Sequence, residues 1–334
     1  MIRTAETVSL GHPDKIADYI TSYLLDRFIE QDPSVKYGVE VMIKDNTVVL
    51  GGEVMGNIDA VHVETHVKQA LRDIGYDERY ADIWGNHAID INKVKVINLI
   101  GIQSSEINQG VMQNGWGDQG VFVGYACKGP DMMPKELYLA KKLNKTLYNM
   151  AKTSDHLGLD IKTQITLDDM GHIKTAIVAI PMLKQEDLTD IITITLGDTP
   201  DEIIVNGTGT YTMHSSIADA GITGRKLACD FYSTACPIGG GSPWTKDGTK
   251  ADLTLNLFAR ELAKEHLQDN DECFVYLSSC IGRCDLPSSV IKTTKNGVVM
   301  TKNITISETP RDLIERFDLT KPIYAQLCKN GLIS

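Results

Sequence analysis

Apolar residues recur about every three or four positions in several stretches of this 334-residue chain, the pattern of helices with one buried face. The clearest stretch follows Pro13, because proline is tolerated in the first turn of a helix. From there apolar side chains continue at helical spacing as far as Phe28. The same spacing predicts further helices over residues 61–74, 135–152, 253–266 and 309–317.

Alternating and short continuous apolar stretches predict the strands. We expect one hairpin over residues 39–50, with its turn at Lys44-Asp45-Asn46, and a second hairpin near Asn296-Gly297. The other expected strands are 94–100, 121–126, the pair 162–167 and 173–180, 191–196, 227–231 and 274–281.

Each third of the chain mixes strands with one or two helices, which predicts an α+β fold of three units whose sheets are backed by helices. We place these units at residues 1–103, 110–210 and 211–334, with segments free to interleave between them. No low-complexity or Pro/Ser-rich linker separates them, so we expect the units to pack tightly.

Composition indicates a globular protein of the cytoplasm, with 42% hydrophobic and 23% charged residues. The net charge of -11 argues against a nucleic-acid or membrane partner, because either surface would need a basic stripe. The seven cysteines form no Cys-x-x-Cys pair, which favours reduced thiols. We also expect no membrane span and no signal peptide.

Two clusters combine a carboxylate, a lysine and glycines at an expected helix start: Gly11 to Lys15, and Lys246 to Asp252. A helix N-terminus attracts anions, and an acid beside a phosphate is suited to hold Mg²⁺. The two clusters therefore suggest one composite site for a polyphosphate and its magnesium, with His12 as a donor to a developing oxyanion. The alternative for the first cluster is an ordinary helix start with a capping acid.

The second cluster follows Gly239-Gly240-Gly241-Ser242, where the backbone can approach a phosphate closely. It is not a Walker A loop, and the alternative is a flexible loop before a helix. Arg225 and Lys226 follow another glycine-bounded turn and suit phosphate contact. Asp118 also lies between glycines, although this motif alone is more typical of a turn.

Other chemistries find less support. No Gly-x-Ser-x-Gly nucleophile motif is present, and His62 and His66 lack the adjacent Glu of a zinc-binding helix. Cys280 and Cys284 are interpreted as core residues. A site rich in Lys, Arg, Asp and Gly suits a reaction that stabilises charge on a leaving group and whose nucleophile needs no deprotonation.

Taken in order, these motifs resemble the S-adenosylmethionine synthetase family, also called methionine adenosyltransferases. The similarity runs from about Thr4 to Tyr324 and begins with residues 6–18, ETVSLGHPDKIAD. It continues, in family order, through residues 51–53, 102–110, 117–120, 162–166, 221–226 and 239–252. The resemblance implies that the sulfur of L-methionine attacks C5′ of ATP and displaces the triphosphate, which is then cleaved to pyrophosphate and phosphate.

The resemblance also implies a role for each matching residue. Two Mg²⁺ ions per site would be held by Asp14 and Asp252, K⁺ by Glu40, and the triphosphate by His12, Lys15, Lys162, Arg225, Lys226 and Lys246. Methionine would be held by Glu53, Gln103, Asp219 and Lys250, and the nucleoside would contact Asp118, Asp160 and a stacking ring at Tyr211, with Ser242 and Ile281 completing the site.

The family fold implies three similar domains about a pseudo-threefold axis, with sheets that pair in a tight homodimer and active sites built by both subunits. Whether dimers pair into tetramers stays open. The chain departs from the family in a short stretch between Gly110 and Gly117, where the family has a mobile loop, at Thr210 in place of an Arg, and in the absence of a C-terminal tail. A non-catalytic regulatory homologue and a stand-alone tripolyphosphatase are therefore the competing hypotheses.

Overall fold

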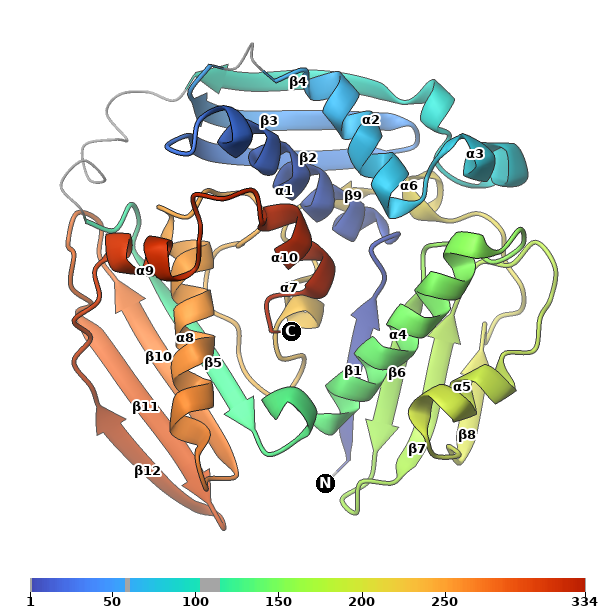
Figure 1. The fold of residues 1–334 in the computed structure, drawn as a ribbon. Coiled ribbons are helices and arrows are strands. Elements are labelled where there is room, and N and C mark those ends of the chain that lie inside the picture. Colours follow the sequence, from blue (N-terminus) through green and yellow to red (C-terminus); the bar gives the residue numbers. More distant parts are fainter. Residues whose placement is uncertain (1, 58–60, 103–114, 334) are drawn as a thin grey trace.

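Three four-stranded sheets surround the middle of the molecule in the computed structural model, which describes residues 2–57, 61–102 and 115–333 (Figure 1). Helix α10 (Tyr324–Asn330) and the C-terminal end lie between them. One long helix packs against each sheet. None of the helices in these ranges is long and apolar enough to cross a membrane.

The first sheet has the order β4-β3-β2-β9 and is packed against helix α1. Strand β2 alternates buried Val39, Val41 and Ile43 with exposed Glu40 and Met42, so one face meets α1 and the other points outward. The elements of this unit are α1 (Pro13–Gln31), β2 (Lys36–Lys44), β3 (Thr47–Met55), α2 (Val63–Ile74), α3 (Glu78–Trp84), β4 (Lys95–Ile102) and β9 (Gly221–Ile222).

The second sheet has the order β1-β6-β7-β8 and is packed against helix α4. Strands β6 and β7 pair antiparallel, which confirms the predicted pair. The elements of this unit are β1 (Arg3–Val8), α4 (Lys135–Thr153), β6 (Lys162–Leu167), β7 (Ile173–Ala179), α5 (Thr189–Leu196) and β8 (Glu202–Val205).

The third sheet has the order β12-β11-β10-β5 and is packed against helix α8. The predicted hairpin at Asn296-Gly297 joins β11 to β12, and Asn296 adopts a positive φ of 50° in its turn. The elements of this unit are β5 (Gly120–Cys127), α8 (Ala251–Leu267), β10 (Glu272–Ser279), β11 (Ser288–Lys295), β12 (Val298–Asn303) and α9 (Pro310–Arg316).

The three units exchange strands along the chain. β1 leaves the N-terminal stretch to join the second sheet, β5 joins the third, and β9 returns from the last third to the first sheet. The α+β fold of three sheet-and-helix units is confirmed. These exchanges bring the first turn of α1, the start of β6 and the loop after β9 toward one another.

Three local predictions were wrong. Residues 191–196 belong to helix α5, where Ile192, Thr195 and Leu196 are buried at helical spacing and Gly197 ends the helix in the left-handed conformation. Residues 227–230 form the short helix α7 (Leu227–Asp230) rather than a strand. An apolar run this short contains too few residues for its spacing to distinguish a helix from a strand. Cys284 is exposed because it lies in the loop after β10, so it fills no core.

Candidate active site

The site begins at the first turn of α1, where His12 caps the helix. Its Nδ1 accepts a hydrogen bond from the backbone N–H of Asp14, 3.2 Å away. Because Nδ1 is the acceptor, the ring proton of the neutral imidazole is on Nε2, which becomes a donor. Burial, with Lys226 and Lys162 nearby, lowers the pKa of His12 to about 3, so the ring is neutral near pH 7.

Asp14 is a buried carboxylate that two neighbouring segments hold in place. Its Oδ2 accepts a hydrogen bond from Lys226 Nζ at 2.6 Å, and its Oδ1 accepts one from the backbone N–H of Ile222 at 2.9 Å. Arg225 Nε lies 3.6 Å from the same Oδ1. Burial opposes ionisation, but the hydrogen bonds from Lys226 and Ile222 outweigh it and lower the pKa of Asp14. Asp14 is therefore charged and paired with a lysine.

Strand β9 delivers Arg225 and Lys226 to this turn. It pairs with β2 and brings Gly221 so close to the backbone of α1 that an added Cβ would lie 2.1 Å from the carbonyl oxygen of Pro13. Only glycine permits this approach. This close approach of the two backbones is what brings residues 221–226 against the His12–Asp14 turn.

Lys15 points away from this cluster. Its Nζ lies 2.7 Å from Asp230 and 3.2 Å from Asp18, and it stands 4.8 Å from the centroid of the Trp244 ring. Burial opposes its charge, but Asp230 and Asp18 outweigh burial and raise the pKa of Lys15. Successive residues of a helix point about 100° apart, so Asp14 and Lys15 face different surroundings. The structure therefore gives Lys15 two buried carboxylates as partners, and the phosphate role that the resemblance implies for it stays a prediction.

The second cluster surrounds Asp252 at the start of α8. Lys246 Nζ lies 3.0 Å from Asp252 Oδ1, and Lys250 caps the helix. Gly241 has a φ of +80°, and an added Cβ there would lie 1.5 Å from the same carboxylate oxygen. The glycine loop therefore closes directly over Asp252, and a side chain at Gly241 would force the two apart.

The segment that contacts the first cluster also touches the loop that precedes the second cluster. An added Cβ at Gly224, one residue before Arg225, would lie 3.2 Å from the Cβ of Ser242, one residue after Gly241. The backbone N–H of Gly224 also donates to Asp18 Oδ1 at 2.8 Å. Residues 221–226 and 239–252 thus touch near Gly224 and Ser242, as the hypothesis of a composite site requires.

Asp160 carries an unused polar atom. Its Oδ2 accepts a hydrogen bond from the backbone N–H of Ser215 at 3.0 Å, whereas its buried Oδ1 has no hydrogen-bond partner among the described residues. Burial raises the pKa of Asp160 to about 6. A buried oxygen without a partner is costly, so this atom is suited to bind a donor from a ligand.

Three further predicted residues lie near these segments. Lys162 is exposed at the start of β6, opposite Val8 of β1. Tyr211 is half-buried, and Asp219 ends the short helix α6 (Ser215–Ala218) with its Oδ1 accepting from the N–H of Ala220.

Glu40 and Glu53 lie on the outward face of the first sheet. Glu40 is opposite Gly51 and Glu53 is opposite Gly38 in the hairpin, so both side chains share one face. Thr223 Oγ1 donates a hydrogen bond to the carboxylate of Glu40. The structure therefore places the predicted K⁺ ligand beside the 221–226 segment and the predicted methionine ligand farther along the same face.

Asp118 and Ile281 lie together at the third sheet, where Val121 at the start of β5 accepts a hydrogen bond from the backbone N–H of Gly240 in the glycine loop. The Ser279 hydroxyl donates to the carbonyl oxygen of Asp118 at 2.9 Å, and Ile281 is paired with Trp116 and 55% exposed. The predicted ligand Gln103 and most of the segment between Gly110 and Gly117 lie outside the described residues.

Comparison with known proteins decides the family. Models of the N-terminal, central and C-terminal domains of S-adenosylmethionine synthetase match residues 1–105, 113–210 and 213–334. An S-adenosylmethionine synthase of Paramagnetospirillum magneticum is 33% identical over 98% of this chain and 91% of its own, and one of Helicobacter hepaticus is 32% identical with the same coverage. The chain belongs to the S-adenosylmethionine synthetase family. The structure of an unusual S-adenosylmethionine synthetase from Campylobacter jejuni agrees, with a TM-score of 0.85 at 30% identity over 99% of this chain and 94% of that one.

As a member of the S-adenosylmethionine synthetase family, the chain is a methionine adenosyltransferase, an ATP-dependent transferase of S-adenosylmethionine biosynthesis. The family uses ATP and methionine and is generally metal-dependent. Among the described residues no group of three or more His, Cys, Asp or Glu side chains could hold a metal alone. Asp14 and Asp252 instead offer one carboxylate each, which fits Mg²⁺ carried partly by substrate phosphates.

Sequence reasoning about this synthetase missed the residues that support the site. Asp230 and Asp18 form ion pairs with Lys15. The hydroxyl oxygen of Tyr80 lies 2.5 Å from Nε2 of His214. His214 directly precedes Ser215, whose backbone N–H donates to Asp160. The spacing of Lys15 and Asp18 on α1 was a readable signal. Asp230 and Tyr80 were not, because they are distant in the sequence from the groups they contact.

Proposed function

We propose that this synthetase makes S-adenosylmethionine by direct attack of the methionine sulfur on C5′ of ATP, followed by cleavage of the displaced triphosphate to pyrophosphate and phosphate. One observation carries the proposal: Asp14 and Asp252 are buried, each contacts a lysine, and the segments that surround them touch. A thioether sulfur has no proton to lose, so the first step needs no general base. Stabilising the leaving triphosphate is the main demand.

The cations of the site would meet that demand. Lys226 and Lys246, with Arg225 and Lys162, would bind triphosphate oxygens, for which charge-assisted hydrogen bonds are the strongest available contacts. The neutral His12 would donate from Nε2 to the oxygen that leaves C5′.

Two Mg²⁺ ions would be held by Asp14 and Asp252, and K⁺ by Glu40. When bound, Mg²⁺ supplies positive charge that neutralises the phosphates. Lys226 and Lys246 would then exchange their present carboxylate partners for phosphate oxygens. The two acids and two lysines would thus form a charge-balanced site before and after the nucleotide binds.

The remaining residues would position the two substrates. Asp160, Asp118 and the ring of Tyr211 would contact the nucleoside, with Ser242 and Ile281 lining the site. Glu53, Gln103, Asp219 and Lys250 would hold the charged ends of methionine. The Oδ1 of Asp160, which has no hydrogen-bond partner in the part of the chain that the structure describes, supports this assignment, since a ribose hydroxyl is a donor that could satisfy it.

A homodimer in the cytoplasm would complete the site. Glu40 and Glu53 share the outward face of the first sheet with the exposed apolar residues Met42, Ile97 and Leu99. A sheet face of this kind is suited to pair with a second copy, because it would bury apolar area and bring further site residues together.

The test is one incubation with ATP, L-methionine, Mg²⁺ and K⁺, with S-adenosylmethionine measured by mass spectrometry and pyrophosphate and phosphate measured separately. We expect equal amounts of the three products. Asp14→Asn and Lys246→Ala should each lower kcat by at least about a hundredfold, whereas the exposed Lys142→Ala should not change it. Unchanged kcat in either site variant would remove that residue from the mechanism. Phosphate release from added tripolyphosphate, with no dependence on methionine and no S-adenosylmethionine formed from ATP, would indicate a stand-alone tripolyphosphatase.

A further inference from the structure

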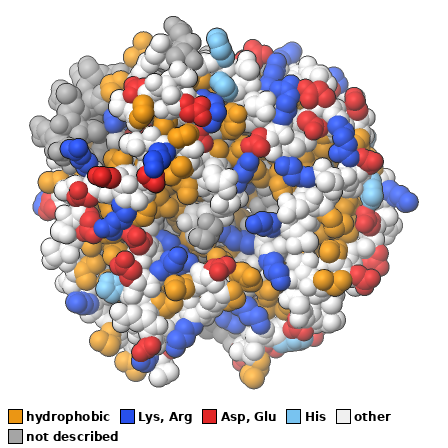
Figure 2. Space-filling view, viewed as in Figure 1, with side chains coloured by type: hydrophobic (Ala, Val, Ile, Leu, Met, Phe, Trp, Pro, Cys, Tyr) orange, Lys and Arg blue, Asp and Glu red, His pale blue; other side chains and the backbone are white. Residues whose placement is uncertain are grey.

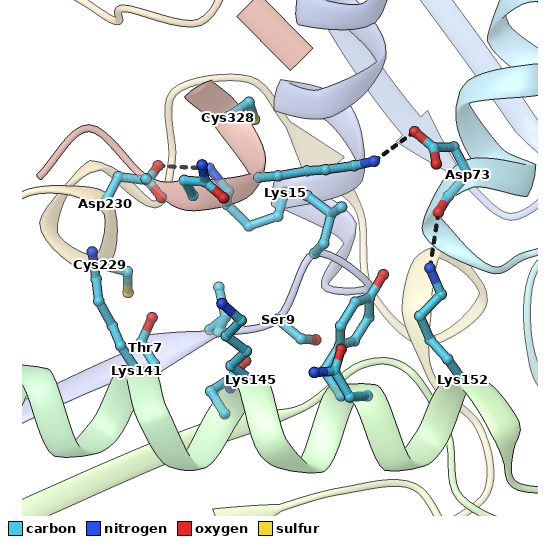
Figure 3. A pocket seen from close by; sticks show the side chains of 18 residues that line it. Thr7, Ser9, Lys15, Asp73, Lys141, Lys145, Lys152, Cys229, Asp230 and Cys328 are labelled. Carbon is cyan, nitrogen blue, oxygen red and sulfur yellow. Dashed lines mark hydrogen bonds and ion pairs between the residues drawn. The ribbon is translucent and has the colours of Figure 1, made fainter. Parts of the chain in front are cut away.

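A lysine-lined cavity of about 560 Å³ lies beside the middle of the molecule, between α4, the first turn of α1, α7 and α10 (Figure 3). Lys and Arg side chains also gather around the middle of this face in the space-filling view (Figure 2). The charged side chains that line the cavity are Lys15, Lys141, Lys145, Lys152, Lys329, Asp73 and Asp230.

The side chains that line the cavity have a net charge of +3, because each of the two carboxylates pairs with one lysine and three lysines are left. Lys15 is paired with Asp230, and Lys329 Nζ lies 2.7 Å from Asp73. The three lysines that are left all come from one face of α4, where they are spaced four and seven residues apart. Figure 3 shows these side chains, Lys141, Lys145 and Lys152, rising from the helix toward the cavity.

Lys152 and Lys145 have room for a ligand. Within the described part of the chain, Lys152 Nζ donates only to the backbone oxygen of Asp73, at 3.1 Å, and it lies over the ring of Tyr148. Lys145 is exposed and makes no ion pair with any residue that the structure describes. Like-charged groups that repel one another along a helix face lower the stability of the free protein, and a bound anion would relieve that repulsion.

Lys141 is the decisive group. Its Nζ is buried and has no hydrogen-bond partner among the described residues, and an added Cβ at Gly331 would lie only 3.1 Å from it. Burial, together with the charges of Lys15 and Arg260, lowers the pKa of Lys141 to about 8, although Asp230 opposes this shift. A buried ammonium group without a hydrogen-bond partner lowers the stability of the folded protein, so Lys141 is suited to donate to an acceptor atom of a ligand.

We propose that this cavity binds a small inorganic oxyanion of the phosphate class, held by Lys141 and Lys145, with Lys152 at its edge. Such an anion brings several acceptor oxygens and two or more negative charges, which match three lysines that pair with no carboxylate in the described ranges. Both inorganic phosphate and pyrophosphate have this chemistry.

The cavity is separate from the proposed catalytic site. On α1, Asp14 faces Lys226 while Lys15 faces the cavity. Asp230, on helix α7 that Lys226 caps, likewise turns to Lys15 and the cavity. The inference therefore does not depend on the proposed mechanism.

Isothermal titration calorimetry of the full chain tests the proposal, with inorganic phosphate and pyrophosphate titrated separately and ionic strength matched by sodium chloride. Lys141→Met keeps the stem of the side chain and removes the charge, and Lys142→Met makes the same change at the exposed neighbour that does not line the cavity. We expect Lys141→Met to raise the Kd of one anion site at least tenfold. Lys142→Met should leave that site intact, and so should Lys246→Ala, which disables the catalytic cluster.

Lys145→Gln gives a second, independent test, because the side chain is exposed and its replacement should not disturb folding. It should weaken the same site. The affinity for the anion should also fall as the pH rises through about 8, because Lys141 loses its proton there. The charged or titratable groups that surround Lys141 are Lys15, Arg260, Asp230 and Cys229. Absence of any anion binding, or binding that only Lys246→Ala removes, would overturn the proposal. The anion with the lower Kd at the Lys141-dependent site is the ligand.

Discussion

The imidazole of His12 is buried among ammonium groups, and its protonation should reflect that environment. We expect its ring to stay neutral down to about pH 4, because its pKa lies at about 3. NMR of protein carrying ¹³C-labelled histidine, assigned with His12→Asn, measures this directly. The exposed His172 is an internal control, since its hydrogen bond with Asp201 raises its pKa above the ordinary value of 6.5. A His12 resonance that titrates near pH 6.5 would show that the ring is solvated.

Lys15 directly follows Asp14 on helix α1 but contacts different side chains. Replacing it with Met would leave the carboxylates of Asp18 and Asp230 buried without their shared cation. We expect Lys15→Met to lower the free energy of unfolding by about 3–5 kcal/mol, the usual cost of breaking a buried pair from one side. Urea denaturation measures the change, with the exposed Lys142→Met as control. Equal stability of the two variants would contradict the structural role and return Lys15 to the phosphate site.

What the sequence could predict about the site was residue type and local spacing. His12 and Asp14 could be placed at a helix start from Pro13 and the apolar period that follows. The pairing of Lys226 with Asp14 was not readable, because it depends on β9 crossing to the first sheet more than 200 residues later. The distant partner of Lys15, Asp230, was not readable for the same reason, because it lies 215 residues away in the sequence.

Among the elements of the site, the glycine loop before α8 makes the sharpest prediction. Gly241→Ala would place a methyl group on Asp252 in a backbone conformation that alanine resists, at a φ of +80°. We expect kcat to fall on the order of tenfold or more as the loop or Asp252 shifts. Gly240→Ala is the matched control, because an added Cβ there meets nothing within 4 Å. Equal kcat in both variants would mean that the loop does not position Asp252.

Helices and strands were predictable in proportion to their length. The periods behind α1, α4 and α8 span four or more turns, and each of those helices was found where the spacing indicated. The segment that became α5 has only eight residues, rich in isoleucine and threonine, and its β-branched composition argued for a strand. Packing against α4 decided otherwise, as tertiary contacts often do for short segments.

The arrangement of the whole molecule leaves an apolar sheet face that no other described part of the chain covers. Ile97 and Leu99 of β4 are 46% and 64% exposed, and Leu99 lies opposite Gly51 of β3, which in turn is opposite Glu40. If the proposed dimer pairs these faces, a charge at Leu99 would be buried against apolar side chains without a counterion.

Leu99→Glu should therefore yield particles with the mass of one 36.8 kDa chain, whereas the unmodified protein should have at least twice that mass by light scattering. Met170→Glu introduces the same charge at a position that is 89% exposed in the turn between β6 and β7, and it should leave the dimer intact. Because Glu40 and Glu53 share the face with Leu99, the monomeric variant should also lose S-adenosylmethionine synthesis while Met170→Glu keeps it. A Leu99→Glu protein that stays dimeric would place the interface elsewhere, and an active monomer would show that one chain holds the complete site.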